Sequence, residues 1–177
     1  MFSAEQAKGL SMIFLETVGQ ETATTKRVLA AVPESQLDFK LGEKGRTARE
    51  LMWHLVRSEE WFGGGVAAGD FSADGSEGPA PATASEIVAH YERHLPPVIE
   101  KLQALSGEQL AKPVNFFNIL NLPLVLYLDL WIRHTVHHRG QLSAYLRAMN
   151  ARVPDIYGGS ADEPFEMPAG TTSGNGS

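Results

Sequence analysis

Four long segments of the chain repeat apolar residues with the period of an α-helix. They run from about Phe2 to Ala31, from Thr47 to Phe62, from Thr83 to Leu105 and from Pro123 to Met149. The second and third open on Thr-x-x-Glu, a capping box in which the hydroxyl and the carboxylate each accept a hydrogen bond from a backbone amide. Strand-like alternation is not sustained along the sequence. The pattern therefore predicts an all-α four-helix bundle.

Glycine and proline mark the expected ends of these helices. Gly63-Gly64-Gly65 predicts that the second helix stops there and that residues 63–81 form a loop. Pro96-Pro97 predicts a kink or break in the third helix, whereas Pro123 suits the first turn of the fourth. Apolar periodicity is lost from residue 164 onward. We therefore expect one domain over residues 1–163, followed by a flexible tail over 164–177.

Composition limits which metal ligands and which binding partners the chain can have. The 177 residues include no cysteine and six histidines, and the net charge is −6. Without cysteine, a bound metal must be held by imidazole or oxygen ligands. The acidic balance and the lack of a basic stripe argue against nucleic-acid binding. We find neither a membrane-spanning apolar segment nor a secretory signal, so we expect a soluble, cytoplasmic protein.

Three of the histidines point toward the predicted core. At about 100° per residue, His134 and His138 lie about 40° apart in the middle of the apolar stripe of the last helix. His54 occupies the same kind of stripe on the second helix. Buried imidazoles need partners, and three nitrogen ligands that leave a fourth position open are typical of a catalytic zinc site. The alternative is that each is a hydrogen-bonded core histidine.

The other histidines are expected to differ in position. His137 falls at the edge of the apolar face of the last helix. His90 and His94 repeat the spacing of His134 and His138, but they lie on a flank of the third helix that we expect to be solvated.

Further polar residues share the histidine-bearing faces. Tyr127, Gln141 and Tyr145 lie on the same stripe as His134, where they would bind a cofactor or substrate or orient a ligand; the alternative is that they only pack in the core. No general base stands out. Asp129 points away from the stripe, and Glu50 is explained by the capping box.

The last helix also has a second, semi-apolar face. It carries Leu128, Ile132, Val136, Gly140 and Ser143. A glycine inside a helix costs roughly 1 kcal/mol relative to alanine, so Gly140 suggests the close approach of another helix. The face predicts a homodimer. The alternative is that other helices of the same chain cover it.

One segment of the chain resembles a known family. His134-Thr-Val-His-His138-Arg-Gly-Gln-Leu-Ser-Ala-Tyr-Leu-Arg147 resembles the last helix of the DinB/YfiT-like family of metal-dependent enzymes. Leu51-Met-Trp-His54 and the residues up to Trp61 resemble the second helix of that family. The stretch Arg152–Glu163 resembles what commonly follows the last helix. The resemblance covers roughly residues 2–163, and its specific part is the last helix.

The resemblance implies an up-down-down-up bundle, often dimeric, in which His54, His134 and His138 bind a divalent ion, zinc or nickel. Relatives include S-transferases and isomerases that use low-molecular-weight thiols, and others are labelled hydrolases. We therefore expect a thiol-dependent S-transferase that acts on a small molecule. A metal-dependent hydrolase and a non-catalytic stress-response binding protein remain the alternatives.

Overall fold

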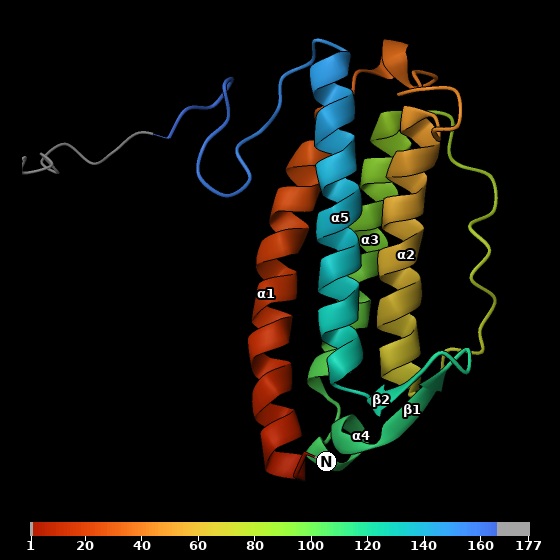
Figure 1. Cartoon of the computed structure of the whole chain (residues 1–177), viewed down its shortest axis with the longest axis vertical. Helices are drawn as coiled ribbons and strands as arrows, with labels where there is room; N and C mark the ends of the chain where they lie inside the picture. Colours follow the sequence, from red (N-terminus) through yellow and green to blue (C-terminus); the bar gives the residue numbers. More distant parts are fainter. Residues whose placement is uncertain (1, 166–177) are drawn as a thin grey trace, which may run out of the picture.

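The computed structural model describes residues 2–165, so the predicted tail lies outside them apart from residues 164 and 165. In Figure 1, α1 and α5 run upward while α2 and α3 run downward, which confirms the all-α, up-down-down-up bundle. A short helix and a 3-10 turn lie in the connections. The helical elements are α1 (Ala4–Ala30), η1 (Glu34–Gln36), α2 (Ala48–Ala68), α3 (Ala84–Gln103), α4 (Gly107–Ala111) and α5 (Leu126–Ala148).

The four long helices pack in a square. α1 contacts α3 and α5, and α2 contacts the same two helices. The connection over residues 69–83 runs along the outside of the bundle from the end of α2 to the start of α3, which lets these two helices run in the same direction (Figure 1). Both predicted capping boxes are formed, by Thr47 with Glu50 and by Thr83 with Glu86. Local signals therefore fix where α2 and α3 begin.

The predicted end of α2 at the three glycines is wrong. The helix continues to Ala68 and ends at Gly69, which has a φ of 67°. A Cβ on Gly63 would lie 2.4 Å from Val98 Cγ1, and one on Gly65 would lie 2.4 Å from the ring of Phe71. These two glycines are therefore needed for close packing inside a helix, and the loop begins only after α2 ends.

The predicted break at Pro96-Pro97 is also absent from α3, which is assigned as one helix from Ala84 to Gln103. Proline lacks the amide that would bond to the carbonyl four residues earlier. Both prolines are exposed, so water can reach the side of the helix on which those bonds are lost.

A β-hairpin closes the lower end of the bundle, where the sequence predicted the start of the last helix. β1 (Pro113–Phe116) pairs antiparallel with β2 (Leu120–Pro123), and α5 begins only at Leu126. The buried Tyr127 hydroxyl donates to the Val114 carbonyl at 2.7 Å and accepts from the Leu122 amide at 3.3 Å. The hairpin is thus held to α5 by a long-range contact that local patterns do not reveal.

The interior contains a buried polar cluster. The Tyr91 hydroxyl donates to the carboxylate of Glu59 at 3.0 Å, and burial raises the pKa of Glu59 to about 8. On α5, Arg139 is 1% exposed and pairs with Glu21 of α1. Within residues 2–165, no helix has the length and apolar character needed to cross a membrane.

Candidate metal centre

Three histidines meet where α2 packs against α5. His54 projects from α2, and His134 and His138 project from adjacent turns of α5. The Nε2 atoms of His54 and His138 are 3.1 Å apart, and one ligand atom from each of the three residues lies within 4.8 Å of the others. The structure therefore brings together the three residues that the helical wheels directed toward one core.

In two of these three rings, the Nδ1 atom contacts an oxygen acceptor. His54 Nδ1 contacts the Glu77 carboxylate, and His138 Nδ1 lies 2.7 Å from Gln141 Oε1. Such contacts place the ring proton on Nδ1 and leave a lone pair on Nε2. Two lone pairs that face each other at 3.1 Å require a proton or a cation between them. The contacts thus turn the Nε2 atoms of both rings toward each other, as shared binding of one ion would require.

His134 supplies the third ring, and its surroundings differ from those of the other two. Its Nδ1 is buried without a hydrogen-bond partner, although an unsatisfied buried nitrogen is costly. Burial, together with the nearby His138 and His54, lowers the pKa of His134 to about 4, and burial likewise lowers the pKa of His138. Both imidazoles are therefore neutral at neutral pH, which is the form that binds metals. The donor set fits a divalent ion.

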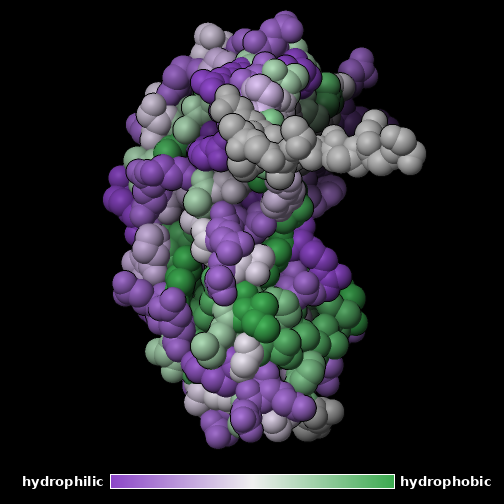
Figure 2. All heavy atoms as spheres, turned by 90° about the vertical axis from the view of Figure 1, so that its left-hand side faces the viewer, coloured by the Kyte–Doolittle hydropathy of each residue, from purple (hydrophilic) through white to green (hydrophobic). Residues whose placement is uncertain are grey.

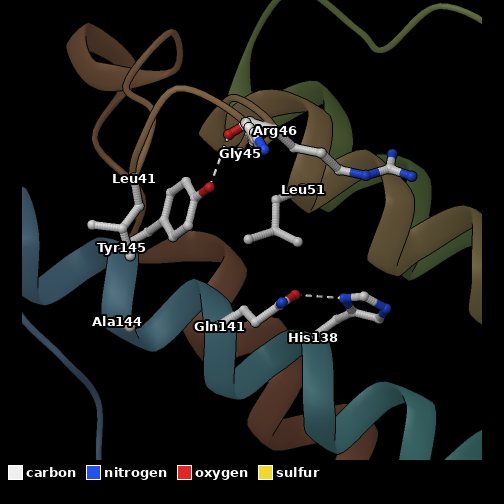
Figure 3. A pocket seen from close by; sticks show the side chains of 9 residues that line it. Leu41, Gly45, Arg46, Leu51, His138, Gln141, Ala144 and Tyr145 are labelled. Carbon is white, nitrogen blue, oxygen red and sulfur yellow. Dashed lines mark hydrogen bonds between the residues drawn. The ribbon is translucent and has the colours of Figure 1, made fainter.

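A cavity of about 400 Å³ lies beside this centre and is shown in Figure 3. α5 contributes His138, Gln141, Ala144 and Tyr145, and α2 contributes Leu51. The remaining wall is the loop before α2, which contributes Leu41, Lys44, Gly45 and Arg46. His138 belongs to both the histidine centre and the cavity wall, so a molecule in the cavity can reach the centre.

The loop is placed against α5 by close contacts. A bridge between Lys40 and Thr47 closes its base, and the Tyr145 hydroxyl donates to the Arg46 carbonyl at 2.9 Å (Figure 3). A Cβ on Gly45 would lie only 2.9 Å from that hydroxyl, so the approach depends on glycine. Arg46 Nη1 bonds to Glu77 Oε2 at 3.0 Å. The loop is therefore connected to the carboxylate that holds His54.

Of the three residues that the sequence analysis proposed for contact with a cofactor or substrate, two line the cavity and one does not. Gln141 and Tyr145, which share the stripe of His134, lie in the cavity wall. Tyr127 does not, because it lies two turns before His134 and its hydroxyl is bound by the hairpin. Glu50 is used by the cap of α2, where the amide of Thr47 lowers its pKa.

One prediction about the other three histidines is wrong. His137 is exposed at the edge of the centre, as predicted, and His94 is exposed on α3. His90, however, is not on a solvated flank. Its side chain is only 21% exposed because it packs against Trp53 and Glu60 of α2.

Three polar residues of the site were missed from the sequence. Glu77 lies in the connection between α2 and α3, and Lys44 and Arg46 lie in the loop before α2. No motif marks them, because loop residues have no periodicity that directs their side chains. Although partial burial opposes it, the contacts with His54 and Arg46 lower the pKa of Glu77 and keep it ionised.

Fold and site together define a helical-bundle protein with a candidate three-histidine metal centre. The chain belongs to the DinB family, whose family model matches residues 6–167. The chain is 25% identical to the uncharacterized protein YrdA of Bacillus subtilis (strain 168) over 157 residues, which cover 85% of this chain and 89% of YrdA.

Solved structures agree with the family assignment. A DinB-like protein from Bacillus cereus ATCC 10987 superposes with a TM-score of 0.71 at 26% identity, covering 81% of this chain and 95% of that one. The DinB-like protein YjoA of Bacillus subtilis has a TM-score of 0.68 at 19% identity, covering 81% and 96%, and at that identity it shows the shared fold alone.

Proposed function

We propose that this protein is a metal-dependent enzyme that transfers a group to or from a small thiol, with His54, His134 and His138 as ligands of zinc or nickel. The observation that carries the proposal is the convergence of three imidazoles, two of them with their lone pairs face to face, beside a cavity. A divalent ion at such a centre lowers the pKa of a thiol or water that shares it.

The cavity supports a small-molecule substrate. Its volume of about 400 Å³ falls within the range of roughly 300–1,000 Å³ that is usual for ligand sites. The exposed Lys44 and Arg46 in its wall favour a ligand with carboxylate groups. Gln141 offers its amide NH2 group toward the bound molecule while its oxygen orients His138, and the Tyr145 hydroxyl, which donates to the Arg46 carbonyl, can still accept a hydrogen bond. The chain has no cysteine, so the sulfur must arrive with a cofactor.

The composition of the wall favours transfer over hydrolysis. Among the described residues that line the cavity, none is a carboxylate. Hydrolysis is helped by a side chain that takes a proton from the metal-bound water and passes it to the leaving group, whereas a thiolate formed at the metal attacks without such a group. A hydrolase would have to recruit Glu77, which is engaged with His54 and Arg46.

Metal reconstitution tests the proposal. Protein stripped with a chelator, and then reloaded with zinc or nickel, should conjugate an alkylating or epoxide electrophile with a low-molecular-weight thiol. We expect product only when metal and thiol are both present. Thiol-independent cleavage of an ester or amide panel would indicate the hydrolase instead. No turnover in either assay would overturn the enzyme and favour a binding protein of the stress response.

We also propose that two copies of the chain associate through the side of the bundle formed by α1 and α5. Figure 2 shows hydrophobic residues gathering on the lower half of the α1 side, and Met12 and Ile13 of α1 are 65% and 61% exposed. On α5, Leu128 of the predicted apolar face is buried within the chain, Ile132 and Val136 are half-buried, and Gly140 is exposed.

Substituting Gly140 by leucine tests this assembly. No atom lies within 4 Å of a Cβ at this position, so the side chain fits the monomer and disturbs only a helix that approaches from outside. We expect Gly140→Leu to lower the association constant by at least about fivefold, since overpacking an interface costs roughly 1–3 kcal/mol. Gly64→Leu on α2, another exposed helical glycine with open space, is the control. Equal sedimentation of both variants and wild type would refute the interface.

A further inference from the structure

A second group of potential ligands lies between α2 and α3. Glu60 of α2 meets His90 and His94 of α3, with one ligand atom of each within 4.8 Å of the others. The two imidazole rings stack with centroids 3.8 Å apart and planes inclined by 15°, so the exposed His94 ring has to turn for both rings to direct a nitrogen at one ion. His90 Nε2 lies 2.6 Å from Glu60 Oε1. These residues come from two helices that pack directly, so bundle formation assembles the group.

This group is separate from the three-histidine centre. Glu60 follows His54 by six positions, which turns its side chain about 120° around α2. The first centre therefore lies between α2 and α5, and the second lies between α2 and α3. Trp53 stands on the second face, where its ring packs against His90 with centroids 4.9 Å apart.

The hydrogen bonds around the group leave ligand atoms available. His94 Nδ1 lies 2.9 Å from the His90 carbonyl, so its proton sits on Nδ1 and its Nε2 carries a lone pair. Arg57 pairs with one oxygen of Glu60, Oε2, and leaves Oε1 facing His90. His90 Nε2 and Glu60 Oε1 are both buried and do not align as a hydrogen bond. The two atoms form an ion pair with each other and have no hydrogen-bonded third partner, so a cation can replace the proton that they share.

We propose that Glu60, His90 and His94 bind a second divalent metal ion. Two imidazoles spaced by one helical turn and a carboxylate from a facing helix form a donor set suited to borderline ions such as Zn²⁺, Ni²⁺ or Cu²⁺. Three protein ligands leave at least one position open. Because His94 is exposed, this position faces solvent. The site carries one carboxylate whose charge is shared with Arg57, and we expect it to bind more weakly than the three-histidine centre.

Zinc titration separates the two sites. Equilibrium dialysis against Zn²⁺ with elemental analysis should show two equivalents per chain for the wild type. His94→Gln alters an exposed residue and should preserve the fold, yet it should weaken the second equivalent by at least about tenfold. Glu60→Gln should do the same. His137→Gln, which removes an exposed histidine of α5, is the matched control and should retain both equivalents.

The same zinc titration in a His54→Ala background tests the second site separately from the proposed enzyme activity. That variant should still bind one equivalent, and adding His94→Gln should remove it. Cu²⁺ bound to the His54→Ala protein should show nitrogen coupling in its electron paramagnetic resonance spectrum, and this coupling should be reduced by His94→Gln. The second site is refuted if His94→Gln and Glu60→Gln leave zinc binding unchanged in both backgrounds.

Discussion

Replacing His138 with alanine is expected to abolish tight metal binding at the three-histidine centre. Its Nε2 faces that of His54 at 3.1 Å, and its Nδ1 is already oriented by Gln141. Loss of a residue that only orients a ligand costs about 10–100-fold in affinity, so loss of the ligand itself should exceed about 100-fold. His54→Ala should have the same effect. Competition with a chromophoric chelator measures the change in the tightest class of sites for zinc and nickel.

The neighbouring His137 supplies the control. It lies on the same helix, one position away, but its side chain is exposed at the edge of the centre. His137→Ala removes an imidazole of the same chemistry and should leave the tight site within about twofold of wild type, as is usual for an exposed substitution. Equal affinity in His54→Ala, His138→Ala and wild-type protein would exclude these histidines as ligands.

Replacing Arg139 with alanine is expected to lower the free energy of unfolding by about 3–5 kcal/mol, the usual loss when one partner of a buried ion pair is removed. Arg139 is 1% exposed, pairs with Glu21, and contacts the Thr25 hydroxyl at 3.4 Å and the hydroxyl of Tyr157. Alanine would leave the Glu21 carboxylate without its cation, and Tyr157 would lose its contact with the guanidinium while keeping its hydrogen bond to Glu21. Urea unfolding of the metal-free protein measures the loss.

Arg133 provides a matched comparison on the same helix. It also pairs with a carboxylate, that of Asp129 one turn earlier, but its side chain is 72% exposed. Arg133→Ala should cost less than about 1 kcal/mol, because exposed pairs are screened by water and salt. Similar losses for both variants would contradict the structural role of Arg139. The expected difference in unfolding free energy would show that neighbouring residues of α5 have different roles. His134 and His138 belong to the three-histidine centre, whereas Arg139 stabilises the packing of α5 against α1.

Local patterns in the sequence determine most of what positions the three-histidine centre. Helical periodicity directs His54, His134 and His138 toward one core, and two capping boxes set where α2 and α3 begin. These features depend on residues within one or two helical turns, so a single chain reveals them. The same wheel puts Gln141 and Tyr145 on the stripe of His134, and the structure then places both in the cavity wall.

Tertiary structure alone decided the remaining features, because each depends on residues far apart in the chain. Gly63 and Gly65 stay helical because Val98 and Phe71 pack against them, and no local rule contains that contact. Tyr127 follows the periodicity of the site, yet the β-hairpin takes its hydroxyl.

The electrostatics of the sites are also non-local. Glu77 contacts His54, although the two residues are 23 positions apart in the sequence. His90 is largely shielded from solvent because Glu60 and Trp53 of another helix pack against it. Helical periodicity gives the direction of a side chain from its own helix but not the partner that it meets. The sequence by itself therefore determined the helices and the inward-facing histidines, and packing decided which groups orient them and which other residues form a second cluster.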